Sequence, residues 1–384
     1  MTGPRKIAPP FRADHVGSLL RPDRLLQARK NAGLGGVGEA ASKGNISAED
    51  LRTIEDDCIR EIVAVQEDVG LEGITDGECR RASWAIDFLS AIEGITMVIP
   101  ESNEGMDFTG NVYRPPVPTT IAKLTRPKNG ILLEDFKFLK SITSKTPKIT
   151  LPAPEILHYR GGRAAVDQEV YPEMEDFFAD IIKVYSEEVQ GLASAGCIYL
   201  QIDNTDTALL CDPEQAKWEQ EKVGLSMREQ VSLQARLING AIKNHPPEMA
   251  ISMHMCRGNN QGQWVAEGGY EPVAEQLFSE FDVDAYFMEY DSERAGDFEP
   301  LRFVPNDRLV VLGLITTKTP ENDPKDQLKR RIDEAAKYIP IENLAISPQC
   351  GMASAFLGNP ITFDDQRRKF ALALEVAEEV WGEI

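Results

Sequence analysis

The chain reads CIYLQI at residues 197–202, shows helical periodicity over 213–243, and then reads MAISMHM at 249–255. A short apolar strand, a long helix and a second apolar strand, in this order, are typical of the parallel βαβ unit. This stretch therefore predicts an α/β fold with a parallel sheet.

The same alternation continues in both directions from this stretch. Strands are predicted at about residues 11–18, 73–76, 149–152, 197–202, 249–255, 285–288, 309–315 and 344–347. Helices are predicted at about residues 47–69, 84–92, 172–195, 213–243, 272–281, 325–338 and 364–381. Eight strands with intervening helices are the count of a (β/α)₈ TIM barrel. A doubly wound sheet fits less well, because no G-x-G-x-x-G motif opens a helix after the first strand.

Residues 98–145 interrupt this pattern. They are rich in Pro, Thr and Gly and contain short alternating runs such as TTIAKL at 119–124. We therefore expect an inserted β segment, a small hairpin near one rim of the barrel. The rest of the pattern predicts one barrel domain over residues 1–384.

The negative net charge argues against nucleic acid and anionic membranes as partners. Lys and Arg number 41 against 62 Asp and Glu, so the net charge is −21, whereas nucleic acid and anionic membranes bind clustered cations. No run approaches eighteen apolar residues, and the first residues lack the apolar centre of a signal peptide. The six cysteines lack the spacing of a disulfide framework. We expect a cytoplasmic protein that acts on small molecules, not on nucleic acid or membrane, with its oligomeric state open.

Parallel barrels collect their reactive groups at the carboxyl ends of the strands. His254 and Cys256 lie two residues apart at the end of the fifth predicted strand, so both project to the same face. Cys350 follows the eighth predicted strand and Glu289 the sixth. Together they offer nitrogen, two sulfurs and oxygen, a set that suits Zn²⁺. Each thiol taken alone is equally readable as a small buried packing residue.

Several segments at these positions resemble a known family. They are HVGSLLRP at 15–22, HMCRGN at 254–259, DFEPLR at 297–302, LGLITTK at 312–318 and SPQCG at 347–351. They are similar to the signature segments of the cobalamin-independent methionine synthase superfamily, and most of all to its short, single-barrel members. The resemblance runs nearly end to end.

This resemblance implies a zinc-dependent methyltransferase of methionine biosynthesis. The expected acceptor is homocysteine, the product methionine, and the donor 5-methyltetrahydrofolate polyglutamate. The implied zinc ligands are His254, Cys256, Glu289 and Cys350. The implied amino-acid site has Gly17 and Ser18 at the substrate carboxylate, and Glu78 and Asp203 at its ammonium group.

The chemistry of the reaction agrees with this residue set. A thiol with a pKa near about 8.5 is mostly protonated at neutral pH, and coordination by Zn²⁺ deprotonates it while leaving the sulfur nucleophilic. A carboxylate such as Glu289 is then the natural ligand to yield when the substrate sulfur arrives. The leaving nitrogen of the donor also needs a proton, and His15 and Asp203 are the candidate acids.

Structural roles are open for several of these residues. His15 is also readable as a histidine that holds the first loop. Glu78 can pair with Arg80 or Arg81 instead of substrate, and Asp203 can serve as a cap or turn residue.

The sequence departs from the long family members at the donor side. Asp203 is followed by Asn204-Thr205 and not by Glu-Pro, and the tryptophan that supports the pterin has no clear counterpart near residues 152–160, where Tyr159 is the substitute. The N-terminal barrel of the long members is absent from these 384 residues. The alternatives are therefore an alkyltransferase with another thiol or donor, such as an epoxide or a corrinoid protein, and a non-catalytic barrel with structural zinc.

Overall fold

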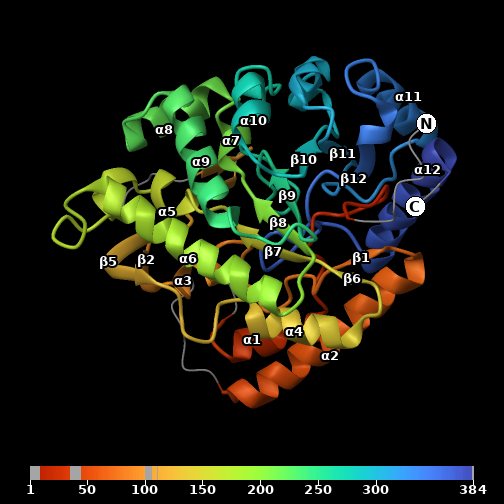
Figure 1. The fold of residues 1–384 in the computed structure, drawn as a ribbon. Helices are drawn as coiled ribbons and strands as arrows, with labels where there is room; N and C mark the ends of the chain where they lie inside the picture. Colours follow the sequence, from red (N-terminus) through yellow and green to blue (C-terminus); the bar gives the residue numbers. More distant parts are fainter. Residues whose placement is uncertain (1–8, 35–44, 100–105, 110, 383–384) are drawn as a thin grey trace.

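The computed structural model describes residues 9–34, 45–99, 106–109 and 111–382. Six parallel strands form its central sheet, in the order β7-β8-β9-β10-β11-β12 (Figure 1). Their bounds are β7 (Ile149–Pro152), β8 (Tyr199–Asp203), β9 (Ala250–Met255), β10 (Ala285–Glu289), β11 (Leu309–Ile315) and β12 (Leu344–Pro348). All six are almost entirely buried, as expected for strands covered on both faces.

Two further segments continue the ring at the edges of this sheet. β1 (Gly73–Ile74) pairs in parallel with β6 (Thr146–Pro147), which leads into β7. At the other edge, Ala13 forms a parallel bridge with Ile346 of β12. The result is the predicted eight-stranded α/β barrel, and the predicted fold class is confirmed.

The N-terminal strand is much shorter than the predicted 11–18, because the chain turns at Gly17. Gly17 has φ +137°, and a Cβ there would lie 2.7 Å from Cγ2 of Thr150. Its carbonyl accepts a hydrogen bond of 2.7 Å from the Thr75 hydroxyl, next to β1. A side-chain hydrogen bond therefore links the N-terminal segment to the β1 segment, where the described residues form no regular backbone pairing between strands.

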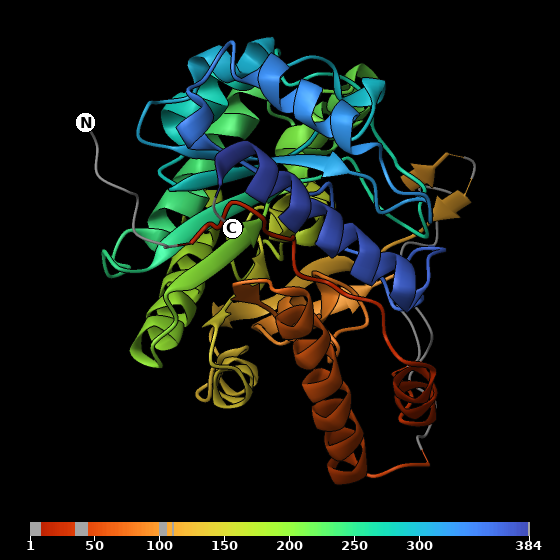
Figure 2. The same cartoon turned by 90° about the vertical axis from the view of Figure 1, so that its right-hand side faces the viewer.

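Helices surround the strands (Figures 1 and 2). They are α1 (Asp23–Asn31), α2 (Ala48–Val69), α3 (Ile86–Ser90), α4 (Leu133–Ile142), α5 (Ile156–Tyr159), α6 (Met174–Ser194), α7 (Asp206–Leu209), α8 (Pro213–Val223), α9 (Met227–Ile242), α10 (Ala274–Glu280), α11 (Lys325–Ala335) and α12 (Phe363–Trp381). α2 begins where the sequence predicts, because the Ser47 hydroxyl accepts a hydrogen bond from the Asp50 amide. It buries Ile59, Ile62 and Val63 on its inner face.

The single helix predicted over residues 213–243 is wrong, because the chain forms two helices there. α8 ends at Gly224, which adopts the left-handed conformation with φ +77°. α9 then begins with a capping box between Ser226 and Glu229. Gly224 and the Ser226–Glu229 pair are both visible in the sequence, but the apolar periodicity that continues across them favours a single long helix.

The antiparallel segment begins before residue 98. β2 (Glu93–Val98) pairs with β5 (Val117–Thr125), and β3 (Met106–Phe108) pairs with β4 (Asn111–Tyr113). The expected range of 98–145 also contains α4, which packs against α2 and α6 as an outer helix of the barrel. α4 buries Phe136 and Leu139, so its apolar face belongs with the barrel and not with the hairpins.

Every second side chain of a strand points to the inside of the barrel. A buried apolar cluster inside the ring comprises Val16, Ala285, Phe287, Leu309, Val311 and Ala345. Beside it the Lys148 ammonium lies 3.1 Å from Asp14 and 4.2 Å from the centre of the Phe287 ring. Because side chains alternate along a strand, Glu289 faces the same side as Phe287, at the carboxyl end of β10.

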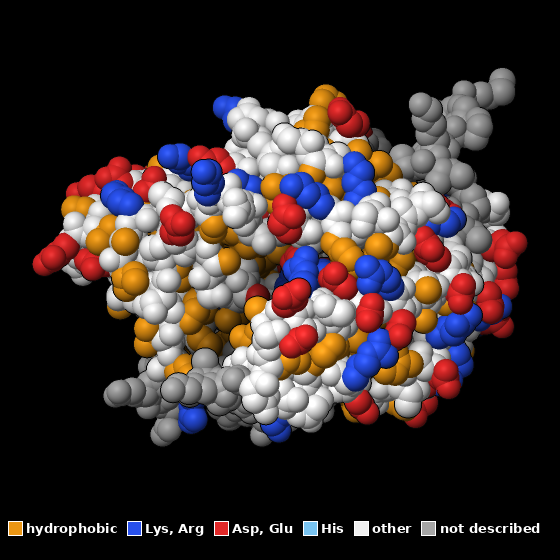
Figure 3. Space-filling model, turned by 90° about the horizontal axis from the view of Figure 1, so that it is seen from below, with side chains coloured by type: hydrophobic (Ala, Val, Ile, Leu, Met, Phe, Trp, Pro, Cys, Tyr) orange, Lys and Arg blue, Asp and Glu red, His pale blue; other side chains and the backbone are white. Residues whose placement is uncertain are grey.

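Acidic and basic side chains are interspersed on the face shown in Figure 3. Among the described helices, none is both long enough and apolar enough to span a membrane.

Candidate functional site

Three side chains that could hold a metal ion converge at the carboxyl ends of the strands. His254 lies on β9, Cys256 follows that strand directly, and Cys350 follows β12. Their ligand atoms all lie within 4.8 Å of one another, and the two sulfur atoms are 3.3 Å apart. All three side chains are buried. The predicted ligands His254, Cys256 and Cys350 are thus brought together.

The chemistry of this group fits a metal such as Zn²⁺. Both ring nitrogens of His254 are buried, and neither has a hydrogen-bond partner among the described residues. A buried polar atom of this kind is costly unless something pairs with it. The hydrogen bond with Cys256 lowers the pKa of Cys350 well below its usual range, an effect that burial opposes and His254 supports. One imidazole and two thiols, one of them readily ionised, are ligands that Zn²⁺ prefers.

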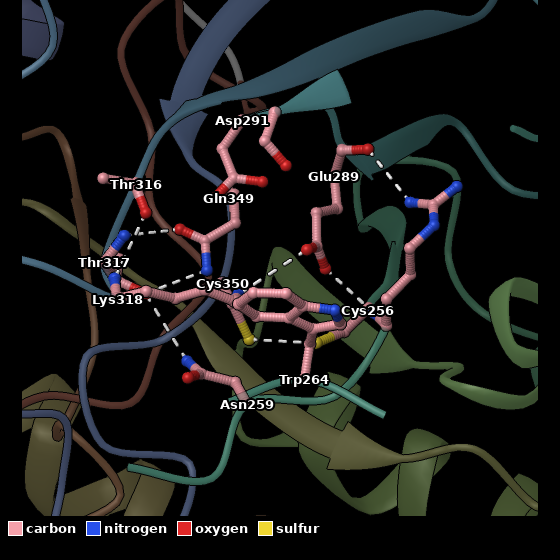
Figure 4. Close-up of polar contacts among 12 residues, drawn as sticks. Cys256, Asn259, Trp264, Glu289, Asp291, Thr316, Thr317, Lys318, Gln349 and Cys350 are labelled. Carbon is pink, nitrogen blue, oxygen red and sulfur yellow. Dashed lines mark hydrogen bonds and ion pairs between the residues drawn. The ribbon is translucent and has the colours of Figure 1, made fainter. Parts of the chain in front are cut away.

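Glu289, the fourth predicted ligand, is not one of the three side chains whose ligand atoms lie within 4.8 Å of one another. Figure 4 shows Glu289 together with Cys256, Cys350 and Lys318. Its Oε1 forms ion pairs with Arg294 and with Lys318, the latter at 3.6 Å, and its Oε2 accepts a hydrogen bond of 2.9 Å from the Arg257 amide. Burial would raise the pKa of Glu289, but Lys318, Arg294 and Arg257 outweigh it and lower the pKa to about 2. Glu289 is therefore ionised and held by cations.

A cavity opens next to the three donors. Its polar lining includes Ser18, Glu78, Ser83, Asp203, His254, Cys256, Asn259 and Cys350. Its apolar lining includes Val16, Trp84, Ile86, Phe108, Pro115, Leu209 and Val265. Tyr159 and Arg160 also line it. The cavity thus combines a group of acids and metal donors with an apolar wall, an arrangement that is typical of small-molecule sites.

Two predicted substrate residues present carboxylates to this cavity. Glu78 accepts a hydrogen bond of 2.8 Å from the Thr150 hydroxyl and forms an ion pair of 3.5 Å with Arg81, the alternative partner expected from the sequence, while its Oε2 has no partner within the described residues. Asp203 accepts a hydrogen bond of 2.7 Å from Gln201. Burial raises the pKa of Asp203 to about 7, with His254 opposing this effect and Glu78 adding to it. Buried acids with spare acceptor atoms are suited to bind a cation.

Of the two residues predicted to bind the substrate carboxylate, only Ser18 lines the cavity. The Ser18 hydroxyl lies so close to Gly351 that a Cβ there would be only 1.8 Å away. Gly17 does not belong to the cavity lining and instead sets the turn that places Ser18.

His15 does not reach the cavity. Val16 points into the barrel, so His15, one residue earlier, points outward. Its ring packs at 5.3 Å from the Phe370 ring of α12, and its Nε2 lies 3.1 Å from the carbonyl oxygen of Gly73. Burial, followed by the charge of Lys148, lowers the pKa of His15 to about 4. The structure thus places this candidate acid in a packing position, away from the cavity.

Comparison with known proteins decides the family. Residues 36–369 match the family model described as "Cobalamin-independent synthase, Catalytic domain". The chain belongs to this family. The resemblance of the sequence segments to the cobalamin-independent synthase family is thereby confirmed.

Relatives of this chain cover nearly its whole length. The uncharacterized protein YxjG of Bacillus subtilis is 41% identical over 97% of this chain and 95% of its own. A protein named methionine synthase from Pyrococcus horikoshii is 24% identical over 88% of this chain and 85% of its own.

Two solved structures have the same overall fold. A candidate vitamin-B12-independent methionine synthase from Listeria monocytogenes has a TM-score of 0.76 at 34% identity and covers 98% of this chain and 99% of its own. A B12-independent methionine synthase from Shewanella in complex with selenomethionine has a TM-score of 0.70 at 19% identity, covering 96% of this chain and 97% of its own.

Sequence reasoning missed the cations around Glu289. Arg294 lies in a short 3₁₀ segment after β10, and Lys318 lies in the loop after β11. Lys318 belongs to the quoted segment at 312–318, but nothing in the spacing links it to Glu289. The pairing of β10 with β11 is what brings these loops together.

A second group of buried acids lies beside the cavity wall. Glu155, Asp206 and Glu219 are almost completely buried, and each has at least one carboxylate oxygen without a partner among the described residues. Burial and then mutual charge raise the pKa of Glu155 and of Glu219, and burial raises that of Asp206 to about 7. The folded state therefore holds protons that the unfolded chain releases above about pH 4.

The contribution of these three acids to stability is expected to fall as pH rises from about 4 through 7, because their raised pKa values favour proton binding by the folded state. Glu219→Gln removes one of the charges, so we expect it to raise the free energy of unfolding by about 2 kcal/mol at pH 8 and to change it little at pH 5. Chemical denaturation at the two pH values measures this. Glu221→Gln, an exposed position on the same helix, is the control. Equal effects of Glu219→Gln at both pH values would contradict the prediction.

Proposed function

We propose that this protein is a zinc-dependent S-methyltransferase that converts homocysteine to methionine. Membership of the cobalamin-independent synthase family supports methyl transfer to a thiol. The observation that carries the proposal is the buried group of His254, Cys256 and Cys350 beside a cavity lined by acids.

In this proposal, His254, Cys256 and Cys350 hold the metal, with Glu289 as the fourth, exchangeable ligand. Zn²⁺ bound there supplies Lewis acidity that keeps a substrate thiol deprotonated and nucleophilic at neutral pH. Glu289 is the ligand best suited to exchange, because its carboxylate already has other partners in Arg294 and Lys318.

The amino-acid end of homocysteine fits the other side of the cavity. Glu78 offers a buried oxygen without a partner, and Asp203 lies on the neighbouring wall, so both suit an ammonium group. Ser18 offers a hydroxyl to the carboxylate, with Gly17 fixing the turn before it.

The donor in this proposal is 5-methyltetrahydrofolate, whose ring system would lie against the apolar wall that contains Trp84, Phe108 and Tyr159. The methyl–nitrogen bond breaks as the methyl–sulfur bond forms, and the leaving nitrogen takes up a proton. Of the two acids expected from the sequence, only Asp203 lines the cavity. With a pKa of about 7, it can carry that proton at neutral pH.

The direct test combines metal analysis with X-ray absorption at the zinc edge, with and without L-homocysteine. We expect one zinc per chain, two sulfur neighbours before homocysteine is added and three afterwards. Methionine formation is then assayed with methyltetrahydrofolate (mono- and triglutamate) and with a methylated corrinoid protein. A metal-free active protein, or a sulfur count that homocysteine leaves unchanged, would contradict the proposal.

A further inference from the structure

We propose that Arg294 and Lys318 are positioning residues that compete with the metal for the Glu289 carboxylate, so that Glu289 is the ligand that the substrate thiol displaces. This inference rests on the function proposed above. It concerns two cations that have no assigned role.

The contacts of Glu289 leave its carboxylate fully engaged. One oxygen pairs with Arg294 and, at 3.6 Å, with Lys318, while the other accepts from the Arg257 amide at 2.9 Å. The Glu289 side chain has no exposed surface, and Arg294 and Lys318 are only 9% and 5% exposed. Water screens such buried pairs weakly, so the two cations compete directly with a metal for the same carboxylate.

Arg294 is itself fixed in place. Its guanidinium donates hydrogen bonds to Asp291 (2.5 Å) and to the Ser292 hydroxyl (2.7 Å), and lies 4.9 Å from the centre of the Trp264 ring. A planar, immobilised guanidinium loses little freedom when it binds a carboxylate. Glu289 therefore meets a preformed partner in Arg294.

Lys318 completes the arrangement. Its ammonium group is buried, makes no hydrogen bond within the described residues and forms an ion pair with Glu289. A flexible lysine of this kind can follow the carboxylate over a short distance. Arg294 thus supplies the rigid contact and Lys318 the adjustable one.

Removal of the rigid contact should shift Glu289 toward the metal. In Arg294→Met, the freed carboxylate is expected to coordinate more strongly, so that a chelator removes the metal more slowly and the substrate thiol displaces Glu289 less readily. Changes around metal ligands typically alter metal affinity by about 10- to 100-fold. We expect the apparent Kd for the thiol to rise about tenfold.

The test uses the purified chain loaded with Co²⁺, whose visible spectrum reports added sulfur ligands. L-Homocysteine is titrated into the wild type, Arg294→Met, Lys318→Met, Glu289→Gln and the Arg294→Met/Glu289→Gln double variant. Metal retention against a chelator is measured for each. Arg302→Met is the matched control, because Arg302 forms a more exposed ion pair with Glu271.

We expect Arg294→Met to weaken thiol binding about tenfold and to slow metal loss, and Lys318→Met to change both in the same direction by less. In the Glu289→Gln background, Arg294→Met should have no further effect. A tenfold loss that persists in that background would mean a structural role and would overturn the inference. So would an Arg294→Met protein with wild-type thiol binding and metal retention.

The two proposals fail in different ways. If homocysteine does not change the wild-type Co²⁺ spectrum, the proposed acceptor is wrong, while the chelator measurement still decides whether Arg294 restrains Glu289. If Arg294→Met does not fold, Lys318→Met decides it, because the inference requires slower metal loss in that variant too.

Discussion

Cys350→Ser is expected to lose bound zinc and activity together. Zinc sites with four protein ligands bind with about 10–16 kcal/mol, so one ligand accounts for about 3 kcal/mol, or roughly a hundredfold in affinity. Cys350 is expected to be a full ligand, because its sulfur lies 3.3 Å from that of Cys256 in the buried group with His254. Metal content after dialysis against a weak chelator, measured beside methionine formation, checks the prediction.

Cys197→Ser is the matched control for this experiment. Cys197 is also buried, but its thiol contacts the carbonyl of Tyr199 at 3.4 Å and lies outside the group of metal donors. It should retain zinc and activity. Full activity in a metal-free Cys350→Ser protein would show that the thiol is not activated by a metal.

Asp203→Asn is expected to raise the KM for homocysteine about 10- to 150-fold, since a hydrogen bond to a charged group contributes about 1.5–3 kcal/mol. It should also lower kcat, because an amide cannot supply the proton that the leaving nitrogen takes up. The change keeps the shape of the side chain and the acceptor that Gln201 uses. Steady-state kinetics at saturating donor measure the effect.

A substrate analogue separates charge recognition from general damage. 4-Mercaptobutyrate has the thiol and carboxylate of homocysteine but no ammonium group, so the wild type should prefer homocysteine and Asp203→Asn should lose that preference. Glu78→Gln should behave in the same direction, because its free oxygen is the second partner expected for the ammonium group. An unchanged homocysteine KM in both variants would remove these acids from the amino-acid site.

The barrel and its metal donors are predictable from the sequence because they depend on local patterns. His254 and Cys256 share a strand face by simple alternation, and the ends of parallel strands meet at one rim. The same alternation places His15 on the outer side, because its neighbour Val16 points into the barrel. The sequence does not predict this position of His15, because the N-terminal strand is too short to show a clear alternation.

The environment of Glu289 is not predictable in this way. Its position after β10 follows from the strand pattern, but the direction of its carboxylate depends on Arg294 and Lys318, which come from two irregular loops. Loop conformations depend on tertiary packing, so no spacing in the sequence indicates which cation meets which acid.

The barrel closes unevenly, so its continuous sheet and its closing seam are expected to differ in how easily they open. The metal donors follow strands of the continuous six-stranded sheet, whereas Ser18 and Glu78 follow the two short segments that join its edges through few backbone hydrogen bonds. Local opening of a protein starts where such bonds are few. In the proposed function, opening at this seam would release the amino acid while the metal donors stay in place at the ends of the six-stranded sheet.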